Sequence, residues 1–255
     1  MILAIETATS ACSAAVVAAD GALVAQRIED EGPAHTQRLL PFVHAVLEEA
    51  GATLGDLDAV VCGLGPGAYT GMRIGVATAR ALAQAAGLRL GGAPTLAAVA
   101  LALASDTRPG TGAVFGTASG AAAAPGSPLV ALLDGKRHEV FAGVFREEAS
   151  AGPLTELGPL AVVAADDLGG FLGEWPGALV GGDGALLYAE RLPATVTLAV
   201  DTATPTAAMV ARAWLAGAPG AVEGLAAVLP VYGRAPDAVR WQARPEARTA
   251  SEGTS

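Results

Sequence analysis

The chain has few aromatic residues, few histidines and only two cysteines. Phe, Tyr and Trp make up 4% of its 255 residues, whereas 52% are hydrophobic. Because Cys12 and Cys62 stand in apolar settings and form no Cys-x-x-Cys pair, we expect free thiols in a reducing compartment. His35, His44 and His138 lack the spacing of a His-x-x-x-His metal site, which disfavours metal-dependent catalysis.

Basic residues and long hydrophobic runs are also scarce. Fifteen Lys and Arg against 25 Asp and Glu give a net charge of −10, so we expect no stable direct binding of nucleic acid. No apolar run approaches the roughly 18 residues of a membrane span. Glu6 follows the start too closely for a signal peptide. We therefore expect a soluble, cytoplasmic protein that does not associate with membranes.

Residues 1–104 form an α/β pattern that predicts one lobe. Three short apolar segments precede the first helical pattern, whereas a Rossmann fold passes directly from its first strand into a helix. Pro41 removes a helical hydrogen bond, so we expect a kink or a helix start near residues 39–41. Thr70 and Thr95 are suitable N-cap residues for the two later helices. The expected strands are 2–5, 13–18, 23–28, 59–64 and 89–92, and the expected helices are 35–50, 70–86 and 95–104.

Residues 105–128 differ in composition from the rest of the chain. Gly, Pro, Ala, Ser and Thr dominate there without periodicity, which is typical of a flexible linker or insertion. Residues 129–234 then repeat the order of strands, turn and helix, which predicts a second lobe and a cleft between the two. We expect the apolar helix at 205–217 to pack back on the first lobe, and residues 235–255 to form a polar, frayed tail.

The most informative segment is Gly65-Pro66-Gly67-Ala68-Tyr69-Thr70-Gly71-Met72-Arg73-Ile74-Gly75. It joins an apolar strand to a helix, as a phosphate-binding loop does, but it contains no Gly-Lys-Ser/Thr sequence, so no lysine can reach a phosphate. One interpretation is a vestigial anion site at Gly65 and Gly67, assisted by Arg73. The favoured interpretation is structural, with the glycines allowing close packing.

Small residues recur at every fourth position of the helix that follows. They are Gly71, Gly75, Ala79 and Ala83. Small side chains let helix backbones approach each other, so this stripe predicts a smooth face on which another helix packs.

Two acidic turns stand where sugar-kinase-like folds carry phosphate-binding or catalytic groups. In the first turn, residues 6–10, Ala8 replaces the usual glycine, and two interpretations stay open: a β-turn satisfied by its own hydroxyls, or a vestigial phosphate turn. In the second turn, Asp134 is either a general base or, as we favour, part of a hairpin tip with Gly135. The residues of the first candidate turn are Glu6, Thr7, Thr9 and Ser10.

Together these segments resemble the bacterial TsaB (YeaZ) family. The resemblance is carried by residues 1–9, 35–41 and 65–75, and it is supported in the same order by 134–145, 182–184 and 230–234. The segment 105–128 departs from the family pattern and looks like an insertion. The resemblance implies an α/β fold of the two-lobed actin-like/sugar-kinase-like (ASKHA) type, duplicated, with mixed sheets flanked by helices.

The resemblance also implies that the chain is not an enzyme by itself. It implies a dimerisation and scaffold subunit that pairs with the catalytic TsaD and recruits the ATPase TsaE. Together they would form N6-threonylcarbamoyladenosine next to the anticodon in tRNAs reading codons that begin with A. No intrinsic cofactor is expected, and ATP or ADP would belong to the complex. The alternatives are an ATP-dependent small-molecule kinase using Glu6, Thr9 and Asp134, or a glycoprotease-like metallopeptidase, which the histidine count disfavours.

By the same resemblance, the partner-binding surface lies on the first two helices of the first lobe. A homodimer through these helices is the alternative when TsaD is absent. A bulky residue at Gly75 or Ala79 is then expected to abolish pairing while leaving the fold intact. The expected interface residues are His35, Leu39, Leu40, Val43, Val46, Leu47, Gly71, Met72, Arg73, Gly75, Val76, Ala79, Arg80 and Ala83.

Overall fold

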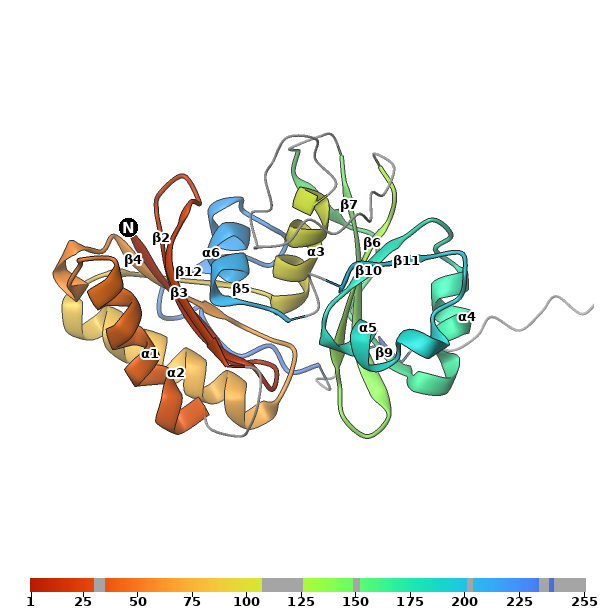
Figure 1. Cartoon of the computed structure of the whole chain (residues 1–255), viewed down its shortest axis with the longest axis horizontal. Helices are drawn as coiled ribbons and strands as arrows, with labels where there is room; N and C mark the ends of the chain where they lie inside the picture. Colours follow the sequence, from red (N-terminus) through yellow and green to blue (C-terminus); the bar gives the residue numbers. More distant parts are fainter. Residues whose placement is uncertain (30–34, 107–125, 149–151, 201–203, 234–238, 241–255) are drawn as a thin grey trace, which may run out of the picture.

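Two sheets stand at opposite ends of the molecule, with helices both between them and outside them (Figure 1). The computed structural model describes residues 1–29, 35–106, 126–148, 152–200, 204–233 and 239–240. Most of the expected linker 105–128 and of the expected tail 235–255 therefore lies outside the described residues.

The first sheet has six strands in the order β12-β5-β4-β1-β2-β3. Its centre is parallel, since β4 pairs in parallel with both β1 and β5, whereas β2 pairs antiparallel with β1 and β3. The carboxyl ends of β1, β4 and β5 therefore meet at one edge. The strands are β1 (Ile2–Glu6), β2 (Cys12–Val17), β3 (Leu23–Glu29), β4 (Ala59–Gly63), β5 (Arg89–Ala93) and β12 (Val222–Glu223).

Helices cover both faces of this sheet, which explains why β1, β2 and β4 are apolar at nearly every position. In β1, Leu3 and Ile5 face the core under α1 (His35–Glu49) and α2 (Tyr69–Ala86). Ile2 and Ala4 face the opposite core, under α6 (Ala207–Leu215). Side chains of successive strand residues point to opposite faces, so a strand covered on both faces reads as a continuous apolar run.

The second sheet follows the order β11-β10-β6-β7-β9-β13, and β8 pairs with β7. Helix α3 (Thr95–Asp106) packs on β6, β7 and β10, while α5 (Asp183–Leu187) packs on β6 and α4 (Leu168–Gly173) on β9. Three 3₁₀ helices are η1 (Leu54–Asp56), η2 (Ala165–Asp167) and η3 (Ala189–Arg191). The strands are β6 (Leu129–Asp134), β7 (Glu139–Glu147), β8 (Leu154–Glu156), β9 (Ala161–Ala164), β10 (Leu179–Gly181), β11 (Thr197–Leu198) and β13 (Val239–Arg240).

The two halves repeat one topology. Strands β5-β4-β1-β2-β3 of the first sheet correspond to β11-β10-β6-β7-β9 of the second, and the helices after the third, fourth and fifth strands correspond as well. The predicted duplicated α/β fold with two mixed sheets flanked by helices is confirmed.

The division into lobes differs from the one expected. Helix α3 belongs to the second sheet although it precedes residue 129, whereas β12 belongs to the first sheet although it precedes residue 234. Helix α6 packs on the first sheet, as expected for residues 205–217. Residues 96–104 of α3 are buried almost throughout, and α3 packs against α6 between the sheets. A helix with apolar residues on all its faces is stable only when every face is buried, and α3 is buried in this way between the two sheets.

Two expectations about helix caps are wrong. Helix α2 begins at Tyr69 after Ala68, so Thr70 is not its N-cap. Thr95 is the first residue of α3, and its hydroxyl donates a hydrogen bond to Glu6 instead of capping the helix. Helix α1 begins at His35, as expected, and contains Pro41 in its second turn, which excludes the alternative start near residues 39–41.

The small-residue stripe of α2 faces the protein's own sheet, and the expected outward stripe is wrong. A Cβ built on Gly75 would lie 2.3 Å from Oγ1 of Thr7 and 3.7 Å from Cγ2 of Ile5. The glycine thus lets α2 approach the end of β1. The buried residues of α2 are Gly71, Met72, Gly75, Val76, Ala79 and Ala83.

Gly75→Ala is therefore expected to destabilise the fold itself, contrary to the expectation from sequence. Alanine gains up to about 1 kcal/mol in helix propensity at an open site. Here its methyl group displaces the Thr7 hydroxyl, so we expect a net loss of about 1–3 kcal/mol in the free energy of unfolding, measured by urea denaturation.

The control is Thr7→Ala in the Gly75→Ala background, which removes the clashing hydroxyl and should recover part of the loss. A Gly75→Ala protein as stable as the unmodified chain would contradict this packing.

Candidate functional site

Four turns converge where the two lobes meet. In the first lobe they follow β1 and β4, and in the second they follow the equivalent strands β6 and β10. Glu6 ends β1, Asp134 ends β6 and Asp183 follows β10. Asp183 lies close enough to repel both Glu6 and Asp134. The duplicated topology thus brings three carboxyl groups to one place.

The Glu6 carboxyl is fully buried and fully engaged. Its Oε1 accepts a hydrogen bond from the backbone N–H of Ala8 at 2.5 Å, and its Oε2 accepts one from the Thr95 hydroxyl at 2.8 Å. Burial raises the pKa of Glu6 from 4.5 to about 7, against the effect of these hydrogen bonds, and the Asp183 charge raises it further. Glu6 therefore acts inside the fold and does not face a ligand.

The other groups of the first turn are also occupied. The Thr7 hydroxyl donates to the carbonyl of Gly71 at 2.8 Å, and Oγ1 of Thr9 accepts from the N–H of Ala11 at 3.3 Å. Ser10 is exposed. This arrangement favours the β-turn that satisfies its own polar groups.

The glycine loop after β4 closes the same turn from the other side. The N–H of Ala68 donates to the carbonyl of Ala8 at 2.6 Å. A Cβ on Gly67 would lie 2.0 Å from that carbonyl oxygen, so the approach requires glycine. Gly65 packs against the Met72 side chain and Gly67 against the backbone of Ala8, where an anion site would need open space.

The turn of the second lobe is held by its own charges. Asp134 accepts from the N–H of Lys136 at 2.8 Å and from its ammonium group at 2.6 Å. The N–H of Asp134 donates to Asp183, and burial raises the pKa of Asp183 from 3.8 to about 6. The geometry fits a hairpin better than a general base at Asp134. Sequence reasoning missed the roles of Asp183, Thr95 and Lys136, although the glycine turn around Asp183 was visible.

The described residues offer little for metal or membrane chemistry. Among them, no three His, Cys, Asp or Glu side chains converge as metal ligands would. None of the described helices has the length and apolarity needed to cross a membrane. Both thiols are buried, and burial raises the pKa of Cys12 to about 11.

The expected interface residues divide into inward and outward groups. Leu39, Val43 and Val46 of α1 are buried in the first lobe, as are the six inward residues of α2 already named. Leu40 is 56% exposed, Leu47 is half-buried, Arg73 is exposed and Arg80 is half-buried. His35 opens α1, but its side chain lies outside the described part of the chain.

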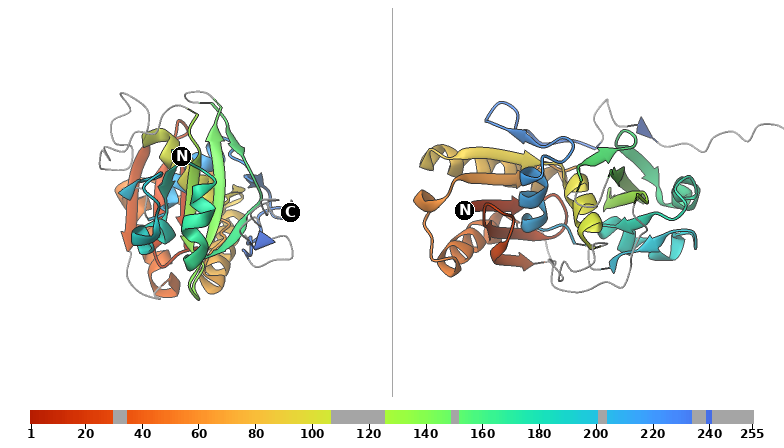
Figure 2. Two further views of the ribbon diagram at one scale, coloured as in Figure 1. Left: turned by 90° about the vertical axis from the view of Figure 1, so that its right-hand side faces the viewer. Right: turned by 90° about the horizontal axis from the view of Figure 1, so that it is seen from above.

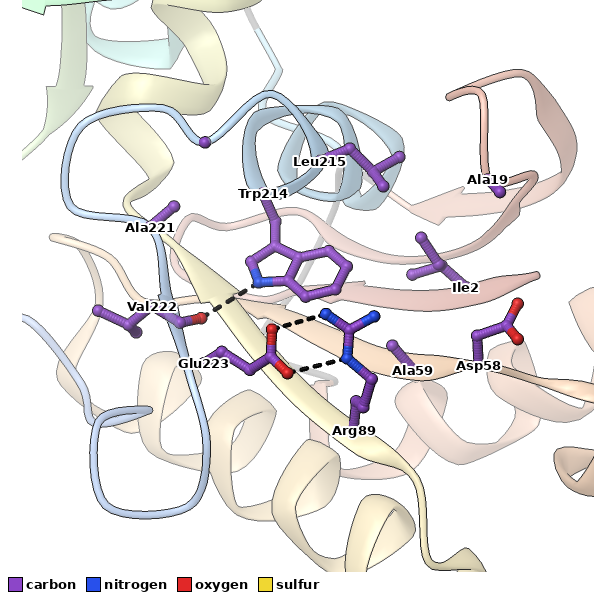
Figure 3. Close-up of a pocket in the computed structure, with 11 residues that line it drawn as sticks. Ile2, Ala19, Asp58, Ala59, Arg89, Trp214, Leu215, Ala221, Val222 and Glu223 are labelled. Carbon is purple, nitrogen blue, oxygen red and sulfur yellow. Dashed lines mark hydrogen bonds and ion pairs between the residues drawn. The ribbon is translucent and has the colours of Figure 1, made fainter.

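A cavity of about 580 Å³ opens at the other end of the first sheet, where β1, β4 and β5 begin (Figure 3). Arg89 lies over the Trp214 ring at 5.2 Å and makes two hydrogen bonds to Glu223 at 2.7–2.8 Å. Asp58 pairs with the amino group of Met1. The charges of this cavity are thus paired within the chain, and the Arg89 cluster joins β12 and α6 to β5.

Comparisons with known proteins agree with this architecture. A family model described as TsaD, tRNA N6-adenosine threonylcarbamoyltransferase, matches residues 29–152. The Escherichia coli tRNA threonylcarbamoyladenosine biosynthesis protein TsaB is 46% identical over 99 residues, which cover 39% of this chain and 42% of that protein. An uncharacterized Mycobacterium leprae protein is 35% identical over 157 residues, covering 60% of this chain and 38% of the relative. The chain thus spans about half or less of the length of these curated relatives.

A solved structure matches over nearly the whole fold. YeaZ from Pseudomonas aeruginosa superimposes with a TM-score of 0.65 at 26% identity, covering 91% of this chain and 99% of that one. The fold places the chain in the TsaD-like class of duplicated ASKHA folds. Within that class, the named relatives and the superimposed structure support an assignment to the TsaB (YeaZ) family.

The raised pKa of Glu6 predicts a pH-dependent stability. The folded state holds the Glu6 proton more tightly than the unfolded chain does. Protonation of Glu6 therefore adds its full contribution to the free energy of unfolding below pH 4.5, and this contribution is lost as the pH rises through 7. A shift of this size corresponds to about 3 kcal/mol. The Glu6→Gln side chain stays neutral at every pH. Between pH 4.5 and 8, the free energy of unfolding of this variant should therefore fall less than that of the unmodified protein, as measured by urea denaturation.

Glu48→Gln is the matched control, because the Glu48 side chain is 79% exposed. It should keep the slope of the unmodified protein. An identical slope in Glu6→Gln would show that Glu6 does not titrate in this range.

Proposed function

We propose that this chain is the non-catalytic subunit that pairs with a TsaD-type threonylcarbamoyltransferase. Together with TsaD it recruits the ATPase TsaE, and the complex forms N6-threonylcarbamoyladenosine next to the anticodon of tRNAs that read codons beginning with A. The similarity to TsaB proteins supports a part in this modification. Nucleotide, if present, belongs to the complex.

The observation that carries the non-catalytic role is the filled turn after β1. A phosphate-binding turn must present unpaired N–H or hydroxyl donors to its ligand. Here the Ala8 N–H donates to Glu6, and the Thr7 hydroxyl donates to Gly71. Gly67 lies against the carbonyl of Ala8, which leaves no room for a phosphate.

The kinase alternative is weaker for the same reason. Of its three expected residues, Glu6 is buried, Thr9 closes its own turn and Asp134 holds Lys136. Tight binding of ATP by the isolated chain, measured by calorimetry, would favour the kinase.

The outward side of α1 and α2 is the surface we assign to the partner. Leu40 and Leu47, seven residues apart, lie on one side of α1. Ile74 and Leu82 of α2 are likewise only partly buried. An apolar helix pair left partly exposed is typical of a protein–protein interface. The same surface would serve a homodimer when TsaD is absent.

Leu40→Asp tests this surface in the complex. We expect co-purification of the chain with its TsaD-type partner to fall more than tenfold, because a carboxylate would be buried among apolar side chains. Modification of tRNA by the reconstituted complex should fall in parallel. Size-exclusion chromatography of the mixed proteins provides the measurement.

Leu187→Asp in α5 is the control, since Leu187 is equally exposed, at 57%, but lies on the second lobe. It should pair normally. Normal pairing by Leu40→Asp would place the interface elsewhere, and no pairing by the unmodified chain would refute the proposed function.

A further inference from the structure

The segment after β12, residues 224–233, folds along α2 and is called the strap here. Arg80 of α2 donates hydrogen bonds to the carbonyls of Leu225 and Val228, the latter at 3.0 Å. The N–H of Val231 donates to the carbonyl of Leu64 at 2.7 Å. In the right-hand view of Figure 2, this blue segment runs along one side of the first lobe. The strap is therefore fixed to α2 and to the loop after β4.

The end of the strap is held by an aromatic and cationic cluster. The rings of Tyr69 and Tyr232 stack with their centroids 5.2 Å apart. The Arg73 guanidinium lies 5.1 Å from the Tyr69 ring and donates to the Tyr69 hydroxyl at 2.9 Å. These contacts orient Arg73 and use only one of its N–H groups, so the others stay available.

A groove of about 400 Å³ lies between the strap and the outer side of α2. Its charged lining residues are Arg73 and Arg80, and none of the described residues that line it is acidic. Neither arginine has an acidic partner among the described residues. Its apolar lining includes Ala77, Ala81 and Leu229, which is 55% exposed. In a chain of net charge −10, this is a basic and apolar surface.

We propose that the groove between the strap and α2 binds an amphipathic helix of the TsaD-type partner that carries a carboxylate. This inference rests on the proposed function and adds the strap to the partner surface. Small residues at positions 77 and 81 let a helix approach closely, and Leu229 covers its apolar side. The two guanidinium groups then meet the carboxylate, since Arg binds carboxylates with paired N–H donors.

Charge separates this occupant from the other candidates. A second copy bound through the same groove would bring two pairs of arginines together, which like-charge repulsion opposes. A nucleic acid would need more basic residues than two, and it would leave Leu229 exposed. A carboxylate on an amphipathic helix would pair with the two arginines, while the apolar side of the same helix would pack on the apolar residues of the groove.

The test uses the full chain with its full-length TsaD-type partner and measures affinity by calorimetry at two salt concentrations. Leu229→Asp and Arg73→Glu should each weaken binding more than tenfold, and Arg73→Glu should also reduce its salt dependence. Leu187→Asp and Arg146→Glu, both on exposed positions of the second lobe, should leave affinity unchanged.

Arg80→Met removes the hydrogen bonds from Arg80 to the strap and so tests whether a fixed strap is needed for binding. Hydrogen exchange of residues 225–231 should become faster, because two carbonyl contacts are lost, and affinity should fall with it. Unchanged affinity for Leu229→Asp and Arg73→Glu, with pairing intact in the unmodified chain, would overturn the groove as a binding site and leave the proposed function standing. Absence of pairing in the unmodified chain would refute the proposed function instead.

Discussion

The buried Glu6 carboxyl is the constraint on which the junction of the two lobes depends. A carboxyl group without access to water must find hydrogen-bond donors inside the protein, and Glu6 takes them from Ala8 and Thr95. Ala8 belongs to the first turn, whereas Thr95 opens α3, which supports the second sheet. A single side chain thus closes a turn in one lobe and fixes the start of a helix that packs on the other.

The closed turn also determines how α2 lies. With Thr7 hydrogen-bonded to the carbonyl of Gly71, the helix must sit close to the end of β1, and Gly75 makes that distance possible. The small residues of α2 are therefore used inside the lobe. What remains outward is a side with Arg73 and Arg80 and no acidic residue, because α2 contains none. On α2, the proposed partner surface consists of the side chains that the internal packing does not use.

Much of the fold could be predicted from the sequence, because its longer elements have strong local signals. The three antiparallel strands before α1 and the repeat of strand, turn and helix in the second half are examples. The sequence could not predict whether the small residues of α2 face the protein's own sheet or a partner. Their spacing places them on one face of the helix but does not identify what packs against that face. The two-residue strand β12 carries too little pattern, and the role of Thr95 depends on Glu6, 89 positions away.

The duplicated topology clarifies how a fold of this class could serve as the proposed partner subunit. The two sets of turns still meet at the junction, and each still begins with an acid, Glu6 in one lobe and Asp134 in the other. Their hydrogen bonds, however, run to protein groups, and the bond between Glu6 and Thr95 joins the first lobe to the helix that packs on the second sheet. Hydrogen bonds from Thr7 and Arg80 likewise fix α2 and the strap within the first lobe. A rigid surface loses little conformational entropy on binding, which favours stable association with a second protein.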